Sequence, residues 1–137
     1  MEWTEDLAVG IAKIDEQHRE LFKRINGLLQ AIREGRCRNE IDGTLRFLDD
    51  YAKFHFSEEE KRMAEAGYAG LEAHKLLHAV YLKNILELER QAELPREGGM
   101  SYELSVTANQ IVVDWIRTHI MQEDKLFGAF IKKQGRP

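Results

Sequence analysis

The chain has 137 residues, one cysteine (Cys37), 24 acidic side chains and 20 lysines and arginines. This length fits one domain over residues 1–137, and a single thiol cannot close an internal disulfide, which suits a reducing compartment. The acidic balance argues against a nucleic-acid binder, and neither an export signal nor a membrane-spanning apolar run is visible. We therefore expect a soluble cytoplasmic protein. A monomer is expected as well, although the sequence does not determine the oligomeric state.

Helical periodicity and turn residues divide the first half of the chain. After an arm over residues 1–14, Asp15 is predicted to cap a first helix that ends at Gly35. A second apolar face begins near Ile41 and stops near Gly67. These patterns predict two long helices joined by a short turn.

The second half repeats this organisation. A third helix is predicted from about Leu71 to just before Pro95, and the clearest break in the chain follows at Gly98-Gly99. Ser101 can cap a fourth helix, so that the bundle extends over about residues 15–133. Four helices of about 20 to 30 residues with short turns predict an all-α, up-down-up-down antiparallel four-helix bundle.

All five histidines fall on the predicted inner faces of these helices, together with two acids. In the acidic stretch from Glu58 to Arg62, Glu59 alone is expected to turn inward while the rest forms a solvated face. Cys37 is expected to have no metal or redox role. The seven candidate metal ligands are His18, His55, Glu59, His74, His78, His119 and Asp124.

The spacing of the turns predicts that these seven side chains meet. In an antiparallel pair, two residues lie at the same height when the turn falls midway between them. The midpoints between ligands on successive helices fall between Gly35 and Asn39, next to Gly67, and at Gly98-Gly99, which are the independently predicted turns. The candidate ligands therefore occupy one layer of the bundle.

Such a layer predicts metal binding, because buried carboxylates without partners cost several kcal/mol each. Seven ligands are too many for one tetrahedral zinc and suit two metals bridged by both carboxylates. Ligand type alone admits iron, manganese or zinc. His119 and Asp124 are about 140° apart on an ideal helix. Either Asp124 reaches in from a neighbouring face, or the helix is locally loosened, as in a π-bulge.

The ordered motifs of the chain resemble those of the hemerythrin family, specifically its single-domain bacterial members, the bacteriohemerythrins. The resemblance covers nearly the whole chain. It is carried by Trp3, Ile14-Asp15-x-x-His18, Leu21-Phe22, His55-Phe56-x-x-Glu59-Glu60, His74-x-x-x-His78-x-x-Tyr81 and Trp115-x-x-x-His119-Ile120-x-x-x-Asp124.

The resemblance implies reversible dioxygen binding at a non-heme di-iron site. One iron would be held by three histidines (His74, His78 and His119) and the other by two (His18 and His55). Glu59 and Asp124 would bridge the two irons, with an oxo or hydroxo group as third bridge. Dioxygen would bind at the two-histidine iron and be held as hydroperoxide. Phe56 and Ile116 would line an apolar pocket that excludes water, although plain core packing explains both residues equally well.

The expected role is oxygen storage or delivery to an oxygen-consuming enzyme, without catalytic residues. A di-iron oxidase or peroxidase is one alternative, but the Glu-x-x-His pairs of ferritin-like enzymes are absent. A zinc hydrolase would need His-Glu-x-x-His, which is also absent. A module that senses oxygen, redox state or nitric oxide remains an alternative that would need a separate partner.

Overall fold

Four long helices build the fold in the computed structural model, which describes residues 2–36, 38–93 and 106–135. A short 3-10 turn, η1 (Glu5–Leu7), precedes α1 (Ala12–Arg33), α2 (Arg38–Ala66) and α3 (Leu71–Glu93). The fourth helix runs without interruption from residue 106 and comprises η2 (Asn109–Asp114), α5 (Trp115–His119), η3 (Ile120–Asp124) and α6 (Lys125–Lys133). No strand occurs in these ranges.

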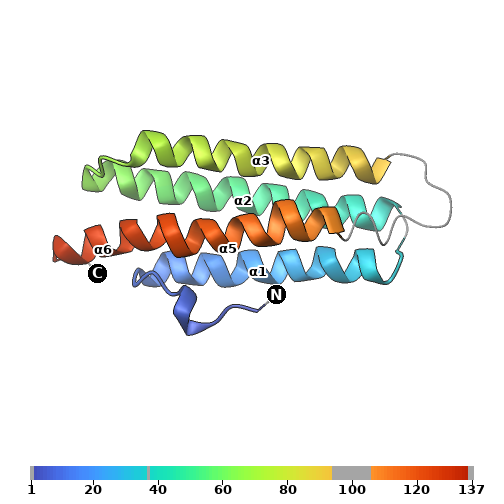
Figure 1. The fold of residues 1–137 in the computed structure, drawn as a ribbon, viewed down its shortest axis with the longest axis horizontal. Helices are drawn as coiled ribbons and strands as arrows, with labels where there is room; N and C mark the ends of the chain where they lie inside the picture. The colour runs from blue at the N-terminus through green and yellow to red at the C-terminus, as the bar shows by residue number, and fades with distance from the viewer. Residues whose placement is uncertain (1, 37, 94–105, 136–137) are drawn as a thin grey trace.

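The helices lie side by side in alternating directions (Figure 1). Along this bundle α1 contacts α2, α2 contacts α3, and α3 contacts the fourth helix at η2. The apolar positions that recur every three or four residues form the common core, because each helix buries one stripe against its neighbours. The predicted all-α four-helix bundle is confirmed. In the first helix every predicted core residue is buried: Leu21, Phe22, Ile25, Leu28, Leu29 and Ile32.

Glycines end the first two helices, as predicted. Gly35 and Gly67 have φ of 62° and 68°, the left-handed region that glycine enters without strain. After Gly67, the Tyr68 N–H donates to the Met63 carbonyl at 2.9 Å, which satisfies one of the free carbonyls at the helix end. The predicted break at Gly98-Gly99 and the predicted cap at Ser101 lie outside the described residues.

The predicted role of Asp15 as the cap of the first helix is wrong. The helix begins at Ala12, so the arm ends at about residue 11 and not at 14. The Asp15 carboxylate instead accepts hydrogen bonds from the backbone N–H groups of Val9 (2.8 Å) and Gly10 (3.3 Å). The arm turns back over the start of α1 and uses this acid to satisfy its own backbone, a contact that helical periodicity alone does not reveal.

A close backbone contact holds the arm against the last helix. A Cβ built on Gly128 of α6 would lie 2.0 Å from the Val9 carbonyl oxygen, far inside contact distance. Gly128→Ala should therefore push the arm away and lower the free energy of unfolding by about 1–3 kcal/mol. Urea unfolding monitored by circular dichroism measures this change.

Gly27 of α1 provides the matched control for this substitution. A Cβ there meets nothing within 4 Å, and the position is exposed. Gly27→Ala should leave stability unchanged or raise it by up to ~1 kcal/mol, because alanine has the higher helix propensity. Equal unfolding curves for the two variants would contradict the proposed arm contact.

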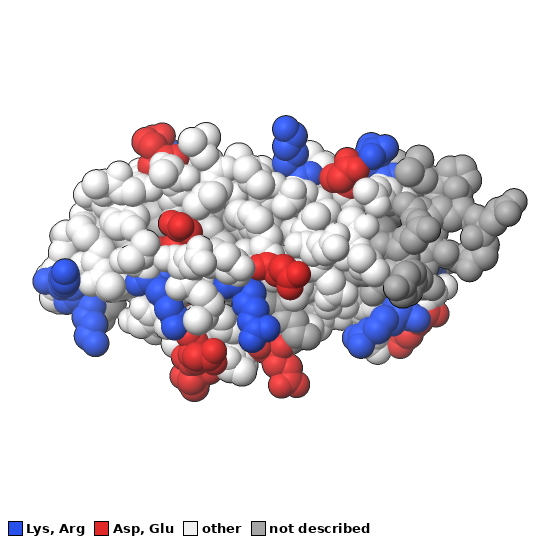
Figure 2. All heavy atoms as spheres, viewed as in Figure 1, with Lys and Arg blue, Asp and Glu red and all other residues white. Residues whose placement is uncertain are grey.

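The surface of the bundle is charged, in contrast to its apolar core. On the face shown in Figure 2, acidic and basic side chains lie interspersed along the helices. Among the described helices, none combines the length and apolar character that crossing a bilayer requires. The seven candidate ligands are all buried beneath this surface.

Candidate metal centre

The structure brings all seven candidate ligands into one buried layer of the bundle. They form two groups that share Glu59 and Asp124, and within each group the ligand nitrogen and oxygen atoms lie within 4.8 Å of one another. Every helix of the bundle supplies at least one of these residues. The first group is Glu59, His74, His78, His119 and Asp124, and the second is His18, His55, Glu59 and Asp124.

Glu59 connects the two groups through its two carboxylate oxygens. Oε1 lies 2.7 Å from His74 Nε2 and 3.3 Å from His78 Nε2. Oε2 faces the other way, 3.5 Å from His55 Nε2 and 3.9 Å from His18 Nε2. One side chain of α2 therefore presents one oxygen to each histidine group.

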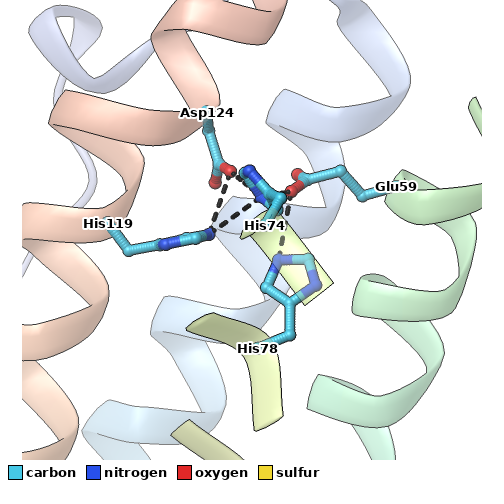
Figure 3. A group of neighbouring side chains, drawn as sticks. All are labelled: Glu59, His74, His78, His119 and Asp124. Atoms are coloured by element: carbon cyan, nitrogen blue, oxygen red, sulfur yellow. Dashed lines mark hydrogen bonds and ion pairs between the residues drawn. The ribbon is translucent and has the colours of Figure 1, made fainter. Parts of the chain in front are cut away.

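Asp124 divides its oxygens in the same way from the opposite side of the layer. Oδ1 lies 3.1 Å from His74 Nε2 and 3.2 Å from His119 Nε2, and Oδ2 lies 3.1 Å from His18 Nε2. Figure 3 shows Asp124 and Glu59 reaching in from two helices toward the imidazoles. Two carboxylates that each join a three-histidine group to a two-histidine group have the arrangement expected of bridging ligands.

A π-helical turn places Asp124 in this layer. The segment Ile120–Asp124, which follows His119 directly, is π-helical. Because a π-turn closes its hydrogen bonds over five residues, residues five apart come onto nearly the same face. Of the two alternatives that the spacing of His119 and Asp124 left open, the structure has the locally loosened helix.

Burial and proximity perturb the carboxylates strongly when no cation is present. Burial and the neighbouring Asp124 charge raise the pKa of Glu59 to about 7. Burial also opposes ionisation of Asp124, but hydrogen bonds from His119, His18 and His74 outweigh it and hold the pKa of Asp124 well below its usual range. In the metal-free layer Asp124 is therefore ionised, whereas Glu59 ionises only with difficulty.

The histidines divide according to their contacts with these carboxylates. Burial lowers the pKa of His78 to about 4 and that of His55 well below its usual range, so both imidazoles are neutral. Burial would also lower the pKa of His74, but hydrogen bonds to Asp124 and Glu59 raise it to about 9. A protonated His74 therefore supplies, in the metal-free chain, positive charge that a bound cation would replace.

The donor set fits a pair of transition-metal ions. Buried polar atoms without a hydrogen bond cost about 1–3 kcal/mol each, and this layer concentrates several of them. Imidazole nitrogens with carboxylate oxygens suit iron, among other divalent metals. Cations between the two groups would satisfy these atoms together. Among these unpartnered atoms are His55 Nε2, His78 Nε2 and Glu59 Oε2.

Two residues that orient the ligands were missed in the sequence. The His55 Nδ1–H donates to Gln17 Oε1 at 2.8 Å, and the His78 Nδ1–H donates to Glu60 Oε2 at 2.7 Å. The prediction that Glu60 belongs to a solvated face is wrong, because α3 packs over it and only a quarter of the side chain is exposed. A sequence signal existed, since Glu60 is one helical turn beyond Phe56 on the inner face of α2.

Phe56 and Ile116, the predicted oxygen-pocket residues, are both buried. The Phe56 ring stacks on the His78 imidazole with centroids 3.9 Å apart and planes 8° apart. Ile116 lies on α5, three residues before His119. The structure therefore places Phe56 directly against the ligand layer and Ile116 in the adjoining core, and their role in an oxygen pocket stays a prediction.

Comparison with known proteins decides the family. The model of the hemerythrin HHE cation binding domain matches residues 9–131. The chain belongs to the hemerythrin family. The bacterial relationship predicted from the motifs is confirmed, because bacteriohemerythrins are among the relatives of this hemerythrin chain.

Two relatives and one solved structure show the extent of the similarity. The bacteriohemerythrin of Clostridium acetobutylicum is 31% identical over 131 residues, which cover 90% of this chain and 95% of the relative. That of Methylococcus capsulatus is 31% identical over 129 residues, covering 93% and 94%. A crystal structure of a wild-type hemerythrin aligns with a TM-score of 0.80 at 30% identity, covering 96% of this chain and 97% of the other. Hemerythrins bind oxygen at a di-iron site, and the buried cluster of this chain fits such a site.

Proposed function

We propose that this protein binds dioxygen reversibly at a non-heme di-iron site and serves as an oxygen store or donor. The observation that carries the proposal is the division of each bridging carboxylate between a three-histidine and a two-histidine group. His74, His78 and His119 would hold one iron, and His18 and His55 the other. Glu59 and Asp124 would hold both, with an oxo or hydroxo group as a third bridge.

Bound iron supplies reversible electron exchange with dioxygen, and the chain supplies an environment that keeps this exchange reversible. Gln17 fixes the His55 ring so that its Nε2 faces the layer. Phe56 covers the layer with an apolar ring. Together with Ile116, it would line the oxygen pocket and exclude water and anions.

An oxidase or peroxidase would need a proton donor beside the two-histidine group. There the Nδ1 of His55 contacts a neutral amide, Gln17, and not an acid. All five histidines are used as ligands in this account, so none serves as a free general acid. This favours a carrier over an enzyme. We propose that a single domain acts as a cytoplasmic monomer and delivers oxygen to an oxygen-consuming enzyme, in preference to sensing.

Repeated oxygenation tests this function. The reduced, iron-loaded protein is exposed to oxygen, flushed with argon and followed by visible absorbance over several cycles. A carrier returns to the same two spectra each time. Conversion to a permanently oxidised form within one or two cycles, with an added substrate oxidised or peroxide released, would favour the enzyme.

Ile116→Ser should shorten the lifetime of the oxygenated protein by about tenfold, which corresponds to ~1.4 kcal/mol of lost barrier. The hydroxyl group would bring water into a fully buried apolar position. Leu126→Ser on α6 is the matched control, because Leu126 is exposed. The rate of spectral decay in air measures both. A lifetime equal to that of the control would remove Ile116 from the pocket.

A further inference from the structure

Two ligand histidines of similar geometry have partners that differ in charge. The His78 Nδ1–H donates to the Glu60 carboxylate at 2.7 Å, whereas the His55 Nδ1–H donates to the Gln17 amide oxygen at 2.8 Å. Both rings direct Nε2 toward Glu59, at 3.3 Å for His78 and 3.5 Å for His55. The two histidine groups therefore contain comparable imidazoles, one with an anionic partner and one with a neutral partner.

Burial accounts for which partner is charged. The Glu60 side chain is 25% exposed, so water solvates part of its carboxylate. Gln17 is only 4% exposed, and a carboxylate in that place would lose most of its hydration. The charged partner, Glu60, thus lies where solvent reaches it, and the neutral partner, Gln17, lies where solvent does not.

The contact between Glu60 and His78 is also rigidly directed. Phe56 stacks on the His78 ring with planes 8° apart, which fixes the ring plane and points Nδ1 at Glu60. Among the described side chains, the buried Nδ1 atoms of His18 and His119 have no hydrogen-bond partner. The hydrogen bond from a ligand imidazole to the Glu60 carboxylate is therefore made by His78, which belongs to the three-histidine group.

We propose that Glu60 is a positioning residue that makes the three-histidine iron harder to reduce. This inference rests on the proposed di-iron function. An imidazole whose N–H is bonded to a carboxylate is a more basic ligand, and a more electron-rich ligand favours the ferric over the ferrous ion. Each ferric ion takes up one electron on reduction to ferrous, so Glu60 lowers the midpoint potential of that step. Gln17 leaves the potential of the two-histidine iron comparatively high.

Spectroelectrochemical titration with mediator dyes tests this assignment, since an electrode supplies the electrons and the readout is a potential. Glu60→Gln keeps a hydrogen-bond acceptor and removes the charge, so the midpoint potential should shift to more positive values. Glu65→Gln removes the same charge from an exposed position of α2 and should leave the potential unchanged. Glu60→Ala also removes the acceptor and should weaken iron binding by about 10- to 100-fold.

The reciprocal variant Gln17→Glu supplies a second, independent result. It places a carboxylate on His55 and should shift the potential to more negative values. If Glu60→Gln holds too little iron to titrate, the potential of Gln17→Glu alone decides whether a carboxylate bonded to a ligand imidazole lowers the midpoint potential. Fully loaded variants with the potential of the unaltered protein would overturn the role of Glu60 and leave the di-iron function intact. Failure of the unaltered protein to hold two irons would overturn both.

Discussion

Removal of both metals should lower the melting temperature of this protein by on the order of 30 °C. Without cations, five imidazoles and two carboxylates face one another in the core, several without a hydrogen bond. A ligand at 1,000 times its Kd stabilises the fold by about 4 kcal/mol per site. For a domain of this size, each kcal/mol corresponds to roughly 3–5 °C. Thermal unfolding of the reduced protein with and without bound iron, under argon, measures the difference.

Restoration of the metal distinguishes a specific site from general effects of ions. Ferrous iron added back to the metal-free protein should restore the higher melting temperature. Magnesium at the same concentration should not, because it prefers an oxygen-rich shell to imidazole nitrogens. Equal melting temperatures for the loaded and metal-free proteins would show that the ligand layer is stable without metal.

Glu59→Ala should reduce bound iron from two ions to less than one per chain. Glu59 presents an oxygen to each histidine group, so its loss removes a ligand from both metals together. Lys61→Ala, two residues further along α2 at an exposed position, is the control and should keep the full complement. Iron per chain, measured by elemental analysis after anaerobic purification, gives the result. Near-normal iron in the Glu59 variant would show that another carboxylate bridges the metals.

Glu59 should have opposite effects on iron binding and on the stability of the metal-free fold. The pKa of Glu59, raised by burial and by Asp124 to about 7 from 4.5, is above its value in the unfolded chain. Stability is therefore lost as pH rises from 4.5 through 7, and the ionised side chain destabilises the metal-free fold above that range. At pH 8, Glu59→Gln should leave the metal-free protein at least as stable as the unaltered chain while impairing iron binding. Marked destabilisation of both forms would assign Glu59 a structural role.

The positions of the helices and the ligand layer were predictable from the sequence, because both depend on features that are local along the chain. Apolar spacing defined the inner face of each helix, and Gly35 and Gly67 ended the first two helices as expected. Antiparallel neighbours then align residues equally distant from a turn, which placed His18, His55 and His74 at one height.

The features that the sequence did not reveal depend on how the helices are rotated and joined. Glu60 lies one helical turn beyond Phe56 on the inner face of α2, but it contacts His78 only because α3 is rotated so that this imidazole lies over it, and helical spacing does not specify that rotation. Asp15 precedes an apolar run as a cap would, yet it accepts hydrogen bonds from an arm that folds back over it. The π-turn before Asp124 is a choice between two backbone geometries that the spacing from His119 left equal.

The most direct test of this account is an anomalous-difference map, measured at the iron absorption edge on crystals of the iron-loaded protein. Two peaks are predicted within the ligand layer, both adjacent to Glu59 and Asp124. One should be contacted by His74, His78 and His119, and the other by His18 and His55. A single peak, or a second peak outside the layer, would contradict the assignment of a carboxylate-bridged pair of metals to these seven residues.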